Sequence, residues 1–223
     1  MNVFISGTSS GIGYQLANLF LENNYEVWGC SRSETNINHK NYHHFLVDLT
    51  QEKEVKSLIL SIETQIKYID IFVSNAGVHN PRLFAELSYE EIYESVRLNI
   101  LAPILLTKSI IDLMNKNQGG SVFFLSSIAA NKDFNGTSLY ASAKSSIEKF
   151  SNLISLEFKK TNINIFTLRL VYIPTKMSKF LSANEIKILK SISGPSSFNS
   201  VEDIYKIICK YHEKPNHASQ LIS

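Results

Sequence analysis

Residues 2–13 read Asn2-Val3-Phe4-Ile5-Ser6-Gly7-Thr8-Ser9-Ser10-Gly11-Ile12-Gly13, and this segment is the clearest indication of the fold class. A short apolar run leads into a glycine-rich turn, and apolar residues at helical spacing follow. In a dinucleotide-binding unit such glycines permit a tight turn, let backbone approach a pyrophosphate and let the helix pack on the strand. We therefore predict that this turn binds a dinucleotide through Gly7, Ser9, Ser10, Gly11, Ile12 and Gly13.

Short apolar runs and helical patterns alternate along the rest of the chain, which is typical of the α/β class. We predict a Rossmann-type doubly wound parallel sheet in a single domain that spans residues 1–223. Further strands are predicted at residues 26–30, 44–47, 69–73, 121–125, 163–168 and 217–222. Helices are predicted at residues 51–67, 89–115, 138–160 and 201–211, with an amphipathic lid at 177–198.

The composition excludes several classes of protein. The chain has 223 residues, 44% of them hydrophobic, and a formal net charge of +2. This near-balance gives no electrostatic reason to expect a nucleic acid or an anionic membrane as partner. Cys30 and Cys209 show no metal-ligand spacing and are too few for a disulfide framework, so we expect no metal and a cytoplasmic location. We expect no leader and no membrane span, because no apolar run reaches the roughly 20 residues that cross a bilayer.

A second motif carries the chemistry. Tyr140 and Lys144 lie four residues apart in a predicted helix, and Ser127 ends a predicted buried strand. Residues at this spacing share one helix face, so the Lys144 cation is expected to lower the pKa of the Tyr140 phenol below about 10. A phenol tuned in this way is a general acid or base for a carbinol oxygen, which Ser127 could also hold. The alternative interpretation is an ordinary amphipathic helix, since Tyr-x-x-x-Lys is a common pattern.

The order of these motifs resembles the short-chain dehydrogenase/reductase family. Over residues 2–177 the chain has the glycine spacing of the single-domain branch, then Ser74-Asn75-Ala76-Gly77, Asn99, Ser127 and Tyr140-x-x-x-Lys144. The resemblance implies hydride transfer between nicotinamide C4 and a carbonyl or alcohol carbon of a small molecule. It implies that Tyr140 is the catalytic acid or base, that Ser127 orients the substrate oxygen and that Asn99 holds a water in the proton relay. Lys144 would bind the nicotinamide ribose, so Tyr140 and Lys144 also count as cofactor-binding residues.

The resemblance also assigns the rest of the cofactor site. Asp48 and Leu49 would bind the adenine, and Asn75, Ala76 and Gly77 would line the adenine ribose. Ile173 and Thr175 would contact the nicotinamide carboxamide, although Leu170 and Val171 replace the Pro-Gly that is usual just before them. By analogy with the family, we expect a homodimer or a homotetramer.

The choice between the two nicotinamide cofactors is predicted from the end of the second strand. An NAD enzyme usually places a carboxylate there for the 2′-hydroxyl, but this chain has Ser31, Arg32 and Ser33. Because Arg32 can pair with a 2′-phosphate through its planar fork, we predict that NADP(H) is preferred over NAD(H). The alternative is that Arg32 is a solvated surface residue.

Two alternatives concern the histidines and the activity. His39, His43 and His44 are predicted to be surface loop residues rather than a metal site, whereas His79 follows the strand end where such sheets bind ligands. The complete set of Asn99, Ser127, Tyr140 and Lys144 favours a working oxidoreductase. The competing hypothesis is a non-catalytic sensor or scaffold that binds NADP(H) through the same fold, and the Leu170-Val171 replacement keeps it open.

Overall fold

The computed structural model describes residues 1–116, 119–174, 187, 198, 200–215 and 221–222. Its centre is a parallel sheet of seven strands in the order β3-β2-β1-β4-β5-β6-β7. The strands are β1 Asn2–Ser6, β2 Glu26–Ser31, β3 Tyr42–Leu46, β4 Ile71–Ser74, β5 Gly120–Ser127, β6 Ile163–Leu170 and β7 Leu221–Ile222. The predicted Rossmann-type doubly wound sheet is therefore confirmed.

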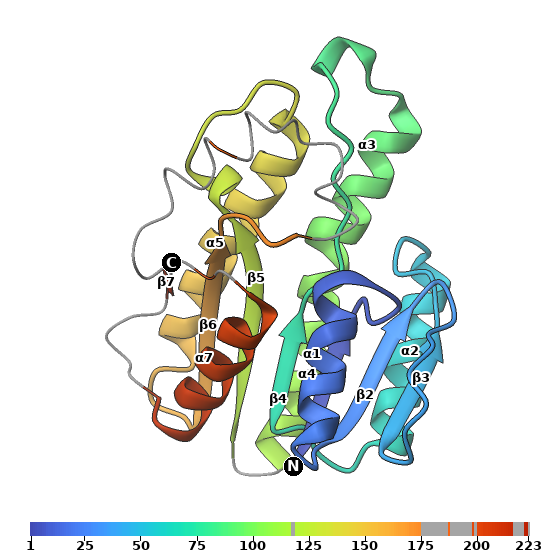
Figure 1. The fold of residues 1–223 in the computed structure, drawn as a ribbon, viewed down its shortest axis with the longest axis vertical. Helices are drawn as coiled ribbons and strands as arrows, with labels where there is room; N and C mark the ends of the chain where they lie inside the picture. Colours follow the sequence, from blue (N-terminus) through green and yellow to red (C-terminus); the bar gives the residue numbers. More distant parts are fainter. Residues whose placement is uncertain (117–118, 175–186, 188–197, 199, 216–220, 223) are drawn as a thin grey trace.

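Helices cover both faces of the sheet (Figure 1). They are α1 Gly11–Glu22, α2 Glu52–Gln65, α3 Tyr89–Val96, α4 Ala102–Lys116, α5 Ser138–Glu157 and α7 Val201–Glu213. Successive strand residues point to opposite faces, so Phe4 packs in the core beneath α2, α4 and α5, while Val3 and Ile5 pack beneath α1 and α7. Both faces of the central strands are buried, as a parallel sheet requires.

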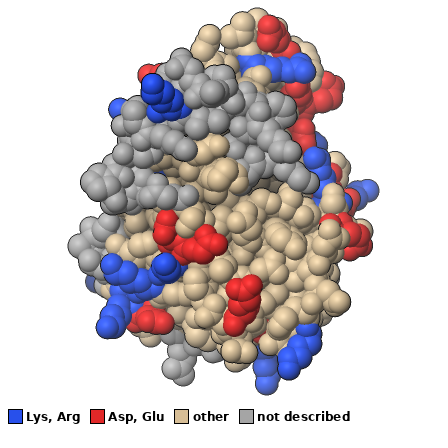
Figure 2. All heavy atoms as spheres, viewed as in Figure 1, with Lys and Arg blue, Asp and Glu red and all other residues tan. Residues whose placement is uncertain are grey.

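Charged side chains are scattered over the surface above α1 and α7. On the described part of this face, Figure 2 shows positive and negative side chains in separate small groups over a largely uncharged surface. No helix of the described residues is long and apolar enough to cross a membrane.

The predicted helix at 89–115 is interrupted in its middle. Residues Arg97–Leu101 form a π-helical turn between α3 and α4, and this turn carries Asn99. Such turns occur mostly as short bulges inside α-helices and are frequent at functional sites. The apolar pattern predicted a helix here, but it contains no signal for the extra residue in the turn.

The prediction that His43 is a loop residue is wrong, because it lies in β3. Of the two predictions made for His44, the strand at 44–47 is correct and the loop is wrong. The ring of His43 stacks on Trp28 with 4.0 Å between centroids, and its Nε2 contacts the Glu26 carboxylate. The flat imidazole rings therefore fit into a half-buried edge strand, although the polarity of histidine alone predicts a loop. His39 precedes the strand and is exposed. Among the described residues, no group of three metal-ligating side chains comes together.

Three predictions fall wholly or partly outside the described residues. Thr175 and nearly all of the lid at 177–198 lie there. The last strand is described only as Leu221–Ile222, which pairs with Thr167 and Leu168 of β6.

Candidate active site

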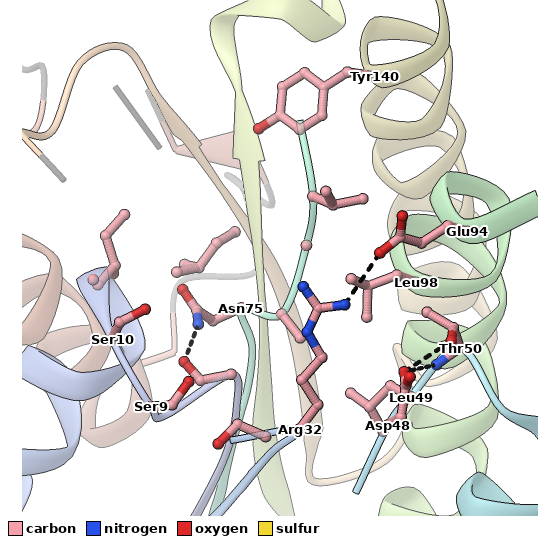
Figure 3. A pocket seen from close by; sticks show the side chains of 18 of the residues that line it. Ser9, Ser10, Arg32, Asp48, Leu49, Thr50, Asn75, Glu94, Leu98 and Tyr140 are labelled. Carbon is pink, nitrogen blue, oxygen red and sulfur yellow. Dashed lines mark hydrogen bonds and ion pairs between the residues drawn. The ribbon is translucent and has the colours of Figure 1, made fainter. Parts of the chain in front are cut away.

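A cavity of about 310 Å³ lies at the carboxyl ends of the strands. The strand order turns back between β1 and β4, and open α/β sheets bind ligands at such a switch point. Figure 3 shows this cavity, with Tyr140 at one end and Arg32 and Asp48 toward the other. Its lining includes the predicted cofactor residues Gly7, Ser9, Ser10, Gly11, Ile12, Ser31, Arg32, Asp48, Leu49, Asn75, Ala76, Gly77, Tyr140 and Lys144.

The glycine-rich turn is held against β4 by one side chain. Asn75 Nδ2 donates to Ser6 O at 2.8 Å and to Gly7 O at 3.1 Å. Gly7 has φ +80°, which L side chains rarely adopt. A Cβ at Gly13 would lie 2.2 Å from Gly7 O, so the start of α1 can approach the turn only without a side chain. The amino end of α1 therefore faces the cavity, where backbone N–H groups favour a phosphate.

Three of the predicted catalytic side chains meet at the Tyr140 end. Tyr140 and Lys144 lie one turn apart on α5, with Lys144 Nζ 5.6 Å from the centre of the phenol ring. Ser127 closes β5 and shares a hydrogen bond with the Tyr140 hydroxyl. Lys144 Nζ donates to Leu125 O at 2.8 Å, so the same strand end positions both the ammonium and the serine.

The prediction that the pKa of Tyr140 lies below about 10 is wrong for this structure. Burial raises the pKa of Tyr140 to about 12, and the hydrogen bond with Ser127 opposes this shift only partly. Burial also lowers the pKa of Lys144 to about 8, against the attraction of the Glu148 carboxylate. The sequence spacing placed the two groups together correctly, but it could not reveal that burial outweighs their mutual effect. At neutral pH the phenol is therefore protonated.

Asn99 holds a strand-end loop in place. Its side chain is 2% exposed, its Nδ2 donates to Val78 O and to Ser95 Oγ, and its Oδ1 accepts from Val78 N. The amide thus ties the π-helical turn to the segment after Gly77. Both N–H groups of the amide are used in these contacts, while Oδ1 keeps a second lone pair for the predicted water.

Ser31 and Arg32, at the end of β2, have different surroundings. Ser31 is buried, and its hydroxyl donates to Ser33 O and contacts His44 Nε2 at 3.2 Å. Arg32 instead reaches into the cavity, where Nη1 lies 3.3 Å from Glu94 Oε1 of α3. Figure 3 shows these two side chains pointing toward each other. Sequence reasoning missed Glu94, since nothing in its own segment places it opposite a residue 62 positions earlier.

A polar cluster behind Lys144 was also missed. Glu148 lies one turn beyond Lys144 on α5, accepts from Ser126 Oγ of β5 at 2.8 Å and pairs with Arg169 of β6 through both carboxylate oxygens. The two charged side chains are 14% and 15% exposed. The cluster joins three elements beside the catalytic residues and next to Leu170, the first residue that departs from the family pattern.

Breaking this cluster should cost stability. We expect Glu148→Gln to lower the free energy of unfolding by roughly 3 kcal/mol, because it leaves the Arg169 charge without its partner in a largely buried place. Urea unfolding measures the change. Glu52→Gln, which removes an exposed partner of Lys56, is the matched control and should leave the midpoint unchanged. Equal midpoints for all three proteins would show that the cluster is not structural.

His79 lies against the catalytic tyrosine. The two rings have centroids 4.4 Å apart at an angle of 32°, and burial lowers the pKa of His79. Its Nε2 is buried and has no hydrogen-bond partner among the residues that the structure describes. His79 is not among the residues that line the described cavity. Its place beside Tyr140 agrees with its position after the end of β4.

Comparison with known proteins identifies the family. The short chain dehydrogenase family matches residues 1–186. The chain is 27% identical over 190 residues to 3-oxoacyl-[acyl-carrier-protein] reductase FabG of Chlamydia trachomatis, an alignment that covers 81% of this chain and 77% of that protein. It is 30% identical over 160 residues to benzil reductase ((S)-benzoin forming) of Bacillus subtilis, with 69% and 65% covered.

Solved structures agree with this fold. 4-Hydroxyisoleucine dehydrogenase complexed with NADH superposes with a TM-score of 0.88 at 19% identity, covering 100% of this chain and 96% of that one. ElxO with NADP bound superposes with a TM-score of 0.83 at 25% identity, covering 99% and 94%. The chain belongs to the short chain dehydrogenase family, and it is an oxidoreductase with an NAD(P)-binding Rossmann fold.

Proposed function

We propose that this protein is an NADP(H)-dependent oxidoreductase that moves hydride between nicotinamide C4 and a carbonyl or alcohol carbon of a small molecule. The observation that carries the proposal is that Tyr140 and Lys144 line one end of the cavity, with Ser127 hydrogen-bonded to the Tyr140 hydroxyl. Many of the other residues that line the cavity are those predicted for the dinucleotide. The cofactor supplies or accepts the hydride. The protein supplies the proton, the orientation and the electrostatics.

Each catalytic residue has a defined task in the reducing direction. The Tyr140 hydroxyl, protonated at neutral pH, gives its proton to the carbonyl oxygen as hydride reaches the carbon. Ser127 donates a hydrogen bond to the same oxygen. Lys144, held by Leu125 O, places a positive charge beside the phenol and stabilises the phenolate left behind. One hydride and one proton are consumed, and the carbonyl becomes an alcohol.

The preference for NADP(H) rests on the end of β2. Arg32 is the first exposed side chain after this strand, and it projects into the cavity. A guanidinium fits a 2′-phosphate by two parallel hydrogen bonds, and Ser31 and Ser33 beside it present no carboxylate to repel the phosphate. The solved structure of ElxO with NADP bound has the same fold.

Replacing Arg32 tests the cofactor preference. We expect Arg32→Ala to weaken NADPH binding about thirtyfold and to leave NADH binding within about twofold, because only NADPH carries the 2′-phosphate that the guanidinium holds. Fluorescence titration of both nucleotides on both proteins measures this. Arg82→Ala, which removes an exposed arginine paired with Glu91 outside the cavity, is the control. Tight NADH binding by the wild type with no effect of Arg32→Ala would overturn the NADP(H) assignment.

We further propose that the protein forms a homodimer through α4 and α5. Leu101, Leu153 and Leu156 expose 43%, 46% and 58% of their surface beside or on these helices. Apolar side chains gathered on one face are characteristic of an interface. Light scattering after size exclusion should give about twice the monomer mass. We expect Leu153→Glu with Leu156→Glu to give a monomer, and a monomeric wild type would contradict the proposal.

A further inference from the structure

The Arg32–Glu94 pair joins the two walls of the cavity at the end predicted for the adenine ribose. Arg32 follows β2, whereas Glu94 belongs to α3 on the opposite side, and both line the cavity. The Arg32 side chain is 66% exposed and that of Glu94 is 32% exposed. The guanidinium that is predicted to bind a 2′-phosphate is therefore already bound to a carboxylate of the protein.

Asp48 is the other carboxylate among the described residues that line this cavity, and its hydrogen bonds are local. Asp48 Oδ1 accepts from Thr50 N at 2.9 Å and from Thr50 Oγ1 at 2.8 Å, which fixes it at the start of the turn before α2. Glu94 instead meets Arg32 across the cavity, at 3.3 Å from Arg32 Nη1 to Glu94 Oε1. Among the described lining residues, Glu94 is thus the carboxylate that a nucleotide phosphate beside Arg32 would meet.

We propose that Glu94 is a specificity-determining residue, which competes with the 2′-phosphate of NADP(H) for Arg32. This competition makes the preference for NADP(H) over NAD(H) smaller. The inference rests on the proposed function, because it assumes that Arg32 receives this phosphate. NAD(H) carries a neutral 2′-hydroxyl, which cannot replace a carboxylate as partner of a guanidinium. NAD(H) therefore binds with the pair intact, whereas NADP(H) binds only as Arg32 changes partner.

The geometry makes this exchange possible. An ion pair exposed to solvent is weak and easily broken, and a phosphate with two negative charges is a stronger partner for the planar fork than a single carboxylate. The competition should therefore reduce NADP(H) affinity without abolishing it. Because the groups are exposed, salt should screen the effect.

A cycle of four proteins tests the competition: wild type, Glu94→Gln, Arg32→Ala and the double variant. Each is titrated with NADPH and with NADH by fluorescence at low ionic strength. We expect Glu94→Gln to tighten NADPH binding about fivefold and to leave NADH binding unchanged. In the Arg32→Ala background the same change should have no effect on NADPH, because no guanidinium remains to be released.

A matched control separates competition from a general change of charge. Glu90 lies one turn earlier on α3, is exposed and does not line the cavity, so Glu90→Gln removes the same charge without touching Arg32. We expect it to leave both affinities unchanged. An equal gain from Glu90→Gln, an equal gain for NADH, or a gain that persists without Arg32 would each overturn the role of Glu94. If Arg32→Ala still weakens NADPH binding in those cases, the proposed NADP(H) preference stands and this inference alone fails.

Discussion

Tyr140→Phe is expected to lower the rate of carbonyl reduction by about 1,000-fold while NADPH affinity stays within about twofold. General acid catalysis by a positioned side chain contributes roughly 10²- to 10⁴-fold, and phenylalanine removes the proton but keeps the ring. The ring still packs against His79, so the shape of the site is preserved. The measurement pairs NADPH oxidation, followed by absorbance, with a fluorescence titration of NADPH.

The control for this variant is another tyrosine. Tyr89 begins α3 and is 78% exposed, so Tyr89→Phe should leave the rate unchanged. Retained activity in Tyr140→Phe would contradict the assignment of the acid. Loss of both activity and NADPH binding would show instead that the hydroxyl organises the cofactor site.

Gly13→Ala is expected to weaken binding of both nicotinamide nucleotides at least 100-fold. The added Cβ would lie 2.2 Å from Gly7 O and 2.5 Å from Asn75 Nδ2, the amide that fastens the turn to β4. Such overpacking typically costs about 1 to 3 kcal/mol of stability and shifts backbone. Here the shifted backbone is the turn predicted to approach the pyrophosphate. Fluorescence titration and thermal unfolding measure the two effects separately.

Gly136→Ala is the matched control for the glycine variant. Gly136 has φ +73°, so alanine is strained there as well, but the residue does not line the cavity. We expect Gly136→Ala to lower stability and to keep nucleotide affinity. If both variants lose affinity in proportion to their loss of stability, the turn has no special role in binding.

The sequence predicted those features that depend on local patterns. The strand, turn and helix of residues 2–13 form as expected, because glycine spacing and apolar periodicity act within a few residues. Tyr140 and Lys144 share a face because four residues make about one helical turn. Their convergence with Ser127 followed from the rule that parallel strands present their carboxyl ends at one edge of the sheet.

Features that depend on tertiary contacts could not be predicted from the sequence. Glu94 meets Arg32 only because α3 stands opposite the end of β2, and Glu148 meets Arg169 only because α5 packs on β6. The pKa of Tyr140 is set mainly by burial, which depends on everything packed around it. The 2.8 Å contact between His44 Nδ1 and the Tyr42 hydroxyl within β3 was not predicted either, because it depends on which face of the strand each side chain takes.

The most direct test of the proposed reaction traces the transferred hydride itself. NADPH carrying deuterium at nicotinamide C4, on one face or the other, is incubated with the wild-type protein and a panel of small ketones and aldehydes, and the alcohols are examined by mass spectrometry. We expect at least one alcohol to gain a single deuterium on its carbinol carbon with one of the two labelled cofactors, and we expect Tyr140→Phe to form almost none. If NADPH binds tightly but transfers no deuterium to any carbonyl, the proposed hydride transfer is contradicted and the non-catalytic sensor or scaffold is favoured.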